Sequence, residues 1–117
     1  MEEVTDPLAR LSARLLPGGA RSWLDLVADA ALAEGVPVAD VVAHRPTPAA
    51  ARARHRWWLD LFLAGYGYKE IEAGTGFEHS TIMSGVHLAA ARRGPEAVVA
   101  VDARARAGSF GARRRRS

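Results

Sequence analysis

The chain of 117 residues contains no cysteine, and its longest apolar runs are short. The lack of cysteine excludes disulfides and cysteine-based zinc sites. No run approaches the roughly 18–20 apolar residues that a membrane-spanning helix needs. The acidic start, residues 1–7, is unlike the basic opening of a signal peptide. We therefore expect a soluble, cytoplasmic protein without a membrane partner.

Motifs for common enzyme chemistry are also missing. No G-x-x-x-x-G-K-[ST] loop is present to hold a triphosphate. Ser80 follows His79, but no G-x-S-x-G motif surrounds it, and Glu70 and Glu72 are two residues apart, so on a helix they point to different faces. HExxH and His-x-His patterns are absent around the four histidines, which are His44, His55, His79 and His87. We expect a binding module with no enzymatic activity, cofactor or metal.

Helical periodicity and capping signals predict an all-α protein of five to six helices, because 117 residues can build one compact core. Ser22 and Asp25 form a capping-box pattern, Gly35 suits a helix end, and Thr47-Pro48 suits a helix start. A turn or two of helix is expected within residues 36–42. The main predicted helices are 6–16, 22–34, 48–64, 68–74 and 79–93, with one more marginal helix at 96–106.

The expected organisation has three parts. Residues 1–21 hold an amphipathic helix and a linker, residues 22–94 hold the main domain, and residues 95–117 hold the marginal helix and a disordered, arginine-rich tail. Leucines at helical spacing in the first helix must be buried on the body or on another copy, which makes residues 6–16 a possible dimer or partner surface; they are Leu8, Leu11, Leu15 and Leu16.

Apolar side chains at helical spacing define the expected core. Trp57 and Trp58 belong to it, and the alternative is that one of them stacks on a nucleic-acid base. The helix at 22–34 should bury Trp23, Leu24, Val27, Ala31 and Leu32. Later helices should bury Leu61, Phe62, Ile82, Val86 and either Ala89 or Ala90.

Residues 65–82 have the pattern of a helix-turn-helix, because glycines at 74 and 76 permit a tight turn and a polar helix start follows. In such a motif the second helix presents its first turn to the major groove of DNA. Glu78, His79, Ser80 and Thr81 are the candidate base-reading side chains. The alternative is that the Ser-Thr pair only caps the helix.

Charge is distributed unevenly along the chain. Residues 1–42 carry three basic and seven acidic side chains, whereas residues 43–93 carry seven basic and four acidic ones, and residues 104–117 carry six basic ones alone. A positive middle and tail fit a protein with one face toward nucleic acid. An ordinary solvated surface of mixed charge would give the same pattern.

Four blocks together resemble the C-terminal DNA-binding domain of the bacterial replication initiator DnaA, a member of the Trp-repressor-like helix-turn-helix group. They occur in the family's order and spacing over about 70 residues, from Ser22 to Arg93. The blocks are Gly35–Val42, Arg52-Ala53-Arg54, Tyr68–Ile71 and Glu78-His79-Ser80-Thr81-Ile82. Three features depart from the family pattern: Phe77 replaces a basic residue, Lys69 replaces a proline, and the turn is one residue shorter.

The resemblance implies double-stranded DNA as the partner. Arg52 corresponds to an arginine that enters the minor groove, and residues 78–81 correspond to the major-groove readers. Backbone contacts are expected from Arg45, Arg54, Tyr68 and Lys69. Three of these candidates also have a structural reading: Arg54 and Lys69 as surface residues, and His79 as a hydrogen-bonding group at the helix start.

We therefore expect a standalone, sequence-specific DNA-binding regulator of transcription or replication, associated with the nucleoid and without the ATPase module of DnaA. The alternative is a helical protein-interaction module that uses the leucine stripe and the basic tail.

Overall fold

The computed structural model describes the backbone of residues 6–116 and the side chains of residues 6–107. That part of the chain is all-helical, as predicted. It contains seven helices and no strand beyond one isolated bridge between Leu15 and Ser22. The helices are α1 (Pro7–Ala13), α2 (Trp23–Glu34), α3 (Val38–Val42), α4 (Pro48–Leu63), α5 (Tyr68–Thr75), α6 (His79–Arg93) and α7 (Pro95–Arg116).

The predicted caps explain where the helices begin and end. The Ser22 side chain accepts from the Asp25 amide at 3.3 Å, and the Asp25 carboxylate accepts from the Ser22 amide at 2.7 Å, which completes the capping box. Gly35 ends α2 in the left-handed conformation, with φ 69°. Thr47 accepts from the Ala50 amide at 3.2 Å and Pro48 is the first residue of α4.

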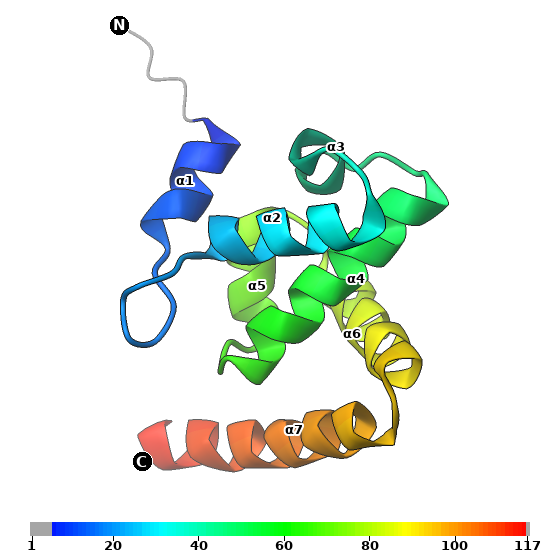
Figure 1. Ribbon diagram of the computed structural model, residues 1–117. Helices are drawn as coiled ribbons and strands as arrows, with labels where there is room; N and C mark the ends of the chain where they lie inside the picture. The colour runs from blue at the N-terminus through cyan, green and yellow to red at the C-terminus, as the bar shows by residue number, and fades with distance from the viewer. Residues whose placement is uncertain (1–5, 117) are drawn as a thin grey trace, which may run out of the picture.

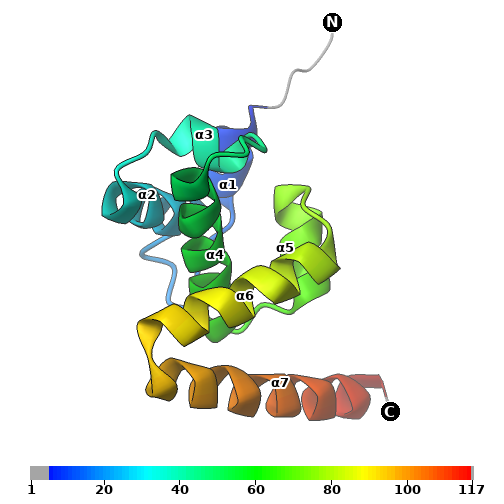
Figure 2. The same cartoon turned by 90° about the vertical axis from the view of Figure 1, so that its right-hand side faces the viewer.

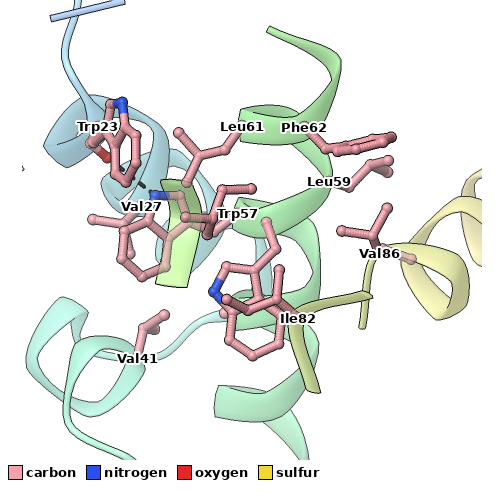
Figure 3. Close-up of a cluster of buried hydrophobic side chains, with 14 of the residues drawn as sticks. Trp23, Val27, Val41, Trp57, Leu59, Leu61, Phe62, Ile82 and Val86 are labelled. Carbon is pink, nitrogen blue, oxygen red and sulfur yellow. Dashed lines mark hydrogen bonds between the residues drawn. The ribbon is translucent and has the colours of Figure 1, made fainter. Parts of the chain in front are cut away.

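Helix α4 is the centre of the molecule (Figure 1), with α2 and α6 packed against it from different sides. Seen from the side, α6 crosses in front of α4, and α7 runs below both (Figure 2). The close-up in Figure 3 shows Trp57, Leu59, Leu61 and Phe62 leaving α4 toward the helices around it. All four are buried, as are Ile82, Val86, Ala89 and Ala90 on α6.

The prediction that Leu32 of α2 belongs to the core is wrong. Leu32 is 82% exposed, whereas Ala30 is buried along with Trp23, Val27 and Ala31. Each residue turns the helix by about 100°, so Leu32, five residues after Val27, points to a different side of α2 from the buried residues. Leu24 is partly buried against the core, as expected.

The core extends into both of the segments that flank residues 22–94. Leu11 of α1 is 4% exposed, Leu8 and Leu16 pack against the core, and only Leu15 of the leucine stripe stays largely exposed. The stripe is therefore mostly buried on the protein's own body. At the other end, Ala97 and Val101 of α7 are buried in the same cluster.

Helix α7 is longer than predicted, since its backbone continues past residue 106 to Arg116. The side chains of the predicted disordered tail, from residue 108 onward, lie outside the described residues. Over residues 6–116, no helix combines the length and the apolar character needed to cross a membrane.

Two glycines let helix backbones approach tryptophan rings. A Cβ placed on Gly74 of α5 would lie 2.4 Å from the Trp23 ring, and one on Gly85 of α6 would lie 2.6 Å from the Trp58 ring. Both positions therefore leave no room for a side chain. These contacts position α5 against the start of α2, and α6 against α4.

Candidate functional site

Helices α5 and α6 are joined by a turn of three residues, Gly76, Phe77 and Glu78. Gly76 adopts φ 84°, a left-handed conformation that favours glycine, and its amide donates to the Glu72 carbonyl at 2.8 Å. Phe77 is 7% exposed and anchors the turn in the core. The turn is thus compact and packed, and Phe77 has a structural role.

The four predicted readers lie together where α6 begins. Glu78 accepts from the Ser80 hydroxyl at 2.7 Å and from the Thr81 hydroxyl at 3.4 Å. His79 Nδ1 lies 3.2 Å from Glu72 Oε1 on α5. Glu78 occupies the N-cap position, and neither hydroxyl caps a backbone amide there. Glu78, Ser80 and Thr81 are exposed to solvent.

The outward face of α6 continues beyond its first turn. Ser84 and His87 are exposed and follow Ser80 at intervals of four and three residues, so the three lie on one stripe of the helix. Met83 and Leu88 are also partly exposed, at 40% and 51%. Ser84 and His87 were missed by the sequence interpretation, although the 3–4 spacing was the signal that could have found them.

A wide hollow separates the start of α6 from the loop before α4. His44 and Pro46 of that loop line one side, and Glu78 and Thr81 line the other. The His44 ring is stacked on Phe77, with centroids 3.9 Å apart. The rest of the lining is Ala51, Arg54, His55, Trp58, Gly76 and Phe77.

The loop before α4 also carries a cation, Arg45, next to the hollow. It stands between the two loop residues that line the hollow, its side chain is 66% exposed, and its Nε lies 3.8 Å from Asp40 Oδ1. A pair this exposed is weak, so the guanidinium is free to exchange Asp40 for another anion.

Arg54 does not lie where a phosphate contact requires, which corrects the expectation from the sequence. It is 7% exposed, and its guanidinium donates to the carbonyls of Asp40 and Val41, each at 3.2 Å, and to the carbonyl of Arg45. Burial lowers the pKa of Arg54. Its role is to hold the α3–α4 connection, which includes the loop that carries Arg45.

Arg52 lies apart from the readers. Its Nε donates to Glu34 Oε1 at 3.0 Å, while the Nε of Arg56 donates to Glu34 Oε2 at 3.1 Å. The hydrogen bond from Arg52 is the main cause that lowers the pKa of Glu34; burial opposes it and Arg56 reinforces it. Arg52 would have to leave Glu34 to enter a minor groove.

The two expected backbone contacts on α5 differ in exposure. Lys69 is exposed at the second position of the helix. The Tyr68 ring is half-buried and stacks on Phe62 with centroids 4.5 Å apart. Burial raises the pKa of Tyr68, and the charge of Arg104 opposes this rise. The Tyr68 ring therefore packs against the core.

Both tryptophans of α4 are 1% exposed, so neither ring can stack on a nucleic-acid base. Trp57 and Trp58 are core residues, as predicted. Trp57 Nε1 donates to the Trp23 carbonyl at 3.2 Å. Trp58 Nε1 and His55 Nδ1 are buried without a hydrogen-bond partner in residues 6–107. Burial lowers the pKa of His55, and the charges of Arg92 and Arg54 lower it further.

Within residues 6–107, no three His, Asp or Glu side chains are placed to bind a metal ion. No protein-family model, curated protein or solved structure matches this chain.

Proposed function

We propose that α5 and α6 form a helix-turn-helix that binds double-stranded DNA sequence-specifically, with α6 in the major groove. The observation that carries this proposal is the outward face of α6, where exposed polar side chains stand at helical spacing from its first turn onward. They are Ser80, Thr81, Ser84 and His87. A helix bearing such side chains can approach base edges closely, while its inner face stays packed on α4.

The side chains at the start of α6 offer complementary base-reading chemistry. A Glu78 carboxylate accepts from cytosine N4, and a His79 nitrogen donates to guanine. The Thr81 methyl suits the thymine methyl. In the free protein Ser80 and Thr81 donate to Glu78, so bases would replace these internal hydrogen bonds without leaving the hydroxyls unpaired.

Cations flank this face and would set its register on the duplex. Arg45 comes from the loop across the hollow, and Lys69 is exposed on α5. Both suit phosphate contacts, which position a protein without specifying sequence. The resemblance to the DnaA DNA-binding domain agrees with this arrangement and gives Arg52 a minor-groove role. We infer a transcription or replication regulator that acts at the nucleoid by occupying a site.

The rival function, a protein-interaction module, receives less support from the fold. It depends on the basic tail and on the leucine stripe of residues 6–16, and in that stripe Leu11 is buried and Leu8 and Leu16 pack on the core. Only Leu15 is left for a partner, at 57% exposure.

Selection of bound duplexes from a random pool tests the proposal, followed by affinity measurements on the selected and on random DNA. Each good base contact contributes about 1–3 kcal/mol of discrimination. His79→Ala and Thr81→Ala should therefore weaken binding to the selected site about 5- to 150-fold and binding to random DNA much less. Ser12→Ala, which removes an exposed hydroxyl on α1, is the matched control and should change neither.

Two results would count against the proposal. If the pool yields no enriched sequence, the protein is not a sequence-specific reader. If both alanine variants lose affinity equally on the two kinds of DNA, residues 78–81 do not discriminate between bases.

A further inference from the structure

A second polar hollow lies on the other side of α4, away from residues 78–81. Four of its six lining residues are arginines, and they come from two helices while the one carboxylate comes from a third. The lining consists of Glu34 on α2, Arg52 and Arg56 on α4, and Ala89, Arg92 and Arg93 on α6. Its volume of about 110 Å³ is room for several water molecules or one tetrahedral anion.

Three of the four arginines of this hollow are held in place by acidic side chains, and each pair leaves part of the guanidinium unused. Glu34 has a side chain only 17% exposed and receives the Nε atoms of both Arg52 and Arg56, which are 42% and 43% exposed. Those two hydrogen bonds do not use the Nη atoms. Arg93 pairs with Asp60 at 3.0 Å. A single, partly buried carboxylate thus orients two guanidinium groups.

Charge in the hollow is not balanced. Arg92 makes no ion pair within residues 6–107, so four guanidinium groups face two carboxylates, those of Glu34 and Asp60. Burial lowers the pKa of the His55 imidazole on α4, and the Arg92 charge lowers it further. Two of the arginines also stand in the last turn of α6, where cations are favoured.

We propose that this arginine hollow is a phosphate-binding site, and that its occupant is a backbone phosphate of the DNA whose major groove α6 reads. Arginine presents a planar fork of donors that matches phosphate oxygens, and preorganised guanidinium groups lose little freedom when they bind. In this proposal Arg52 remains bound to Glu34 and contacts a phosphate, in place of the minor-groove role that the resemblance implies. That the phosphate belongs to DNA rests on the function proposed above. That the hollow binds phosphate is independent of that function.

Nuclear magnetic resonance of the arginine side chains tests the site directly. The Nε–H groups of Arg52 and Arg56 bond to Glu34 and serve as reporters. The full chain is titrated with sodium tripolyphosphate, against sodium chloride at equal ionic strength, and separately with a duplex. Both tripolyphosphate and duplex should shift the two reporters, and chloride should not.

Variants connect the site to DNA binding. Arg92→Gln, and the double variant Arg56→Gln/Arg92→Gln, should flatten the plot of log affinity against log salt by about 0.9 for each phosphate that the variant no longer neutralises. Arg92→Lys, which keeps the charge without the fork, should shift the slope less. Arg10→Gln on α1 is the control for the removal of an exposed arginine and should leave the slope unchanged. Because Arg92 has no ion pair to lose, its variant keeps the test valid if the double variant unfolds.

The outcomes separate this inference from the proposed function. Reporters that respond to tripolyphosphate while the protein binds no duplex would support the phosphate site and overturn DNA as its occupant. Sequence-specific DNA binding with an unchanged salt slope in the Arg92 variants, and reporters indifferent to tripolyphosphate, would overturn the inference and leave the proposed reader standing.

Discussion

Gly85 of α6 lies directly against the indole of Trp58 on α4, so close that a Cβ would approach ring carbon Cε3 to 2.6 Å. Trp58 is 1% exposed and cannot swing into solvent. Gly85→Ala should therefore lower the free energy of unfolding by about 1–3 kcal/mol, although alanine favours helix formation. Thermal and urea unfolding measure the change.

Ser84→Ala is the control for Gly85→Ala, because it puts the same side chain on an exposed position of the same helix. It should leave stability unchanged or raise it slightly. A Gly85→Ala protein as stable as the wild type would mean that α6 can move off α4 at little cost.

Arg54 offers a test that separates structural from DNA-contacting arginines. Arg54→Met removes the donor to three backbone carbonyls and leaves buried acceptors unpaired, so stability should fall by about 1–3 kcal/mol. Measured on duplex DNA at a temperature where the variant is folded, the salt slope should match that of the wild type. A flatter slope with unchanged stability would restore the phosphate contact that the sequence predicts for this residue.

The lowered pKa of His55 predicts a pH dependence of stability. The folded state disfavours the charged imidazole, so the unfolded chain binds more protons as the pH falls below the ordinary histidine pKa of about 6.5. The contribution of His55 is present above that pH and is lost as the pH falls through the folded pKa. His55→Gln should therefore weaken the decline in stability between about pH 7 and pH 5.

Urea unfolding at several pH values measures this decline. The exposed histidine His87 supplies the control variant His87→Gln, which should follow the wild-type curve more closely than His55→Gln does. Identical pH profiles for the wild type and His55→Gln would show that burial does not disfavour the imidazolium here.

The arginine-rich tail gives a prediction that is independent of the fold. If residues 113–116 lie along DNA, removal of residues 108–117 should weaken specific and random binding alike and flatten the salt slope by up to about 0.9 for each phosphate that the tail neutralises. Sequence preference should survive, because residues 78–81 remain. A truncated protein without sequence preference would show that α6 is not the reader.

The helix boundaries were largely predictable because their signals are local. A capping box at Ser22, a proline after Thr47 and a left-handed glycine at Gly35 each act within a few residues, and the structure contains all three. The direction of a long side chain depends on tertiary neighbours instead. Arg54 is buried because it donates to backbone carbonyls of the α3–α4 region. Leu32 is exposed because other residues form the buried face of α2.

The candidate site divides in the same way. The polar start of α6 could be located from the sequence, because glycines and a polar block mark it. The arginine hollow could not, because Glu34, Arg56 and Arg92 are far apart in the chain and meet only when α2, α4 and α6 pack. Pairing of Arg52 with Glu34 has the same origin.

Helix α7 limits how far the chain can be truncated at its C-terminal end. Arg104 lies over the Phe62 ring and donates to the Gly65 carbonyl, and Val101 is buried in the core. Leu11 closes the opposite end of the same core. A fragment trimmed to residues 22–94 would expose these surfaces and should aggregate or unfold. Minimal fragments for crystallisation or binding work need to begin before α1 and to reach past Arg104.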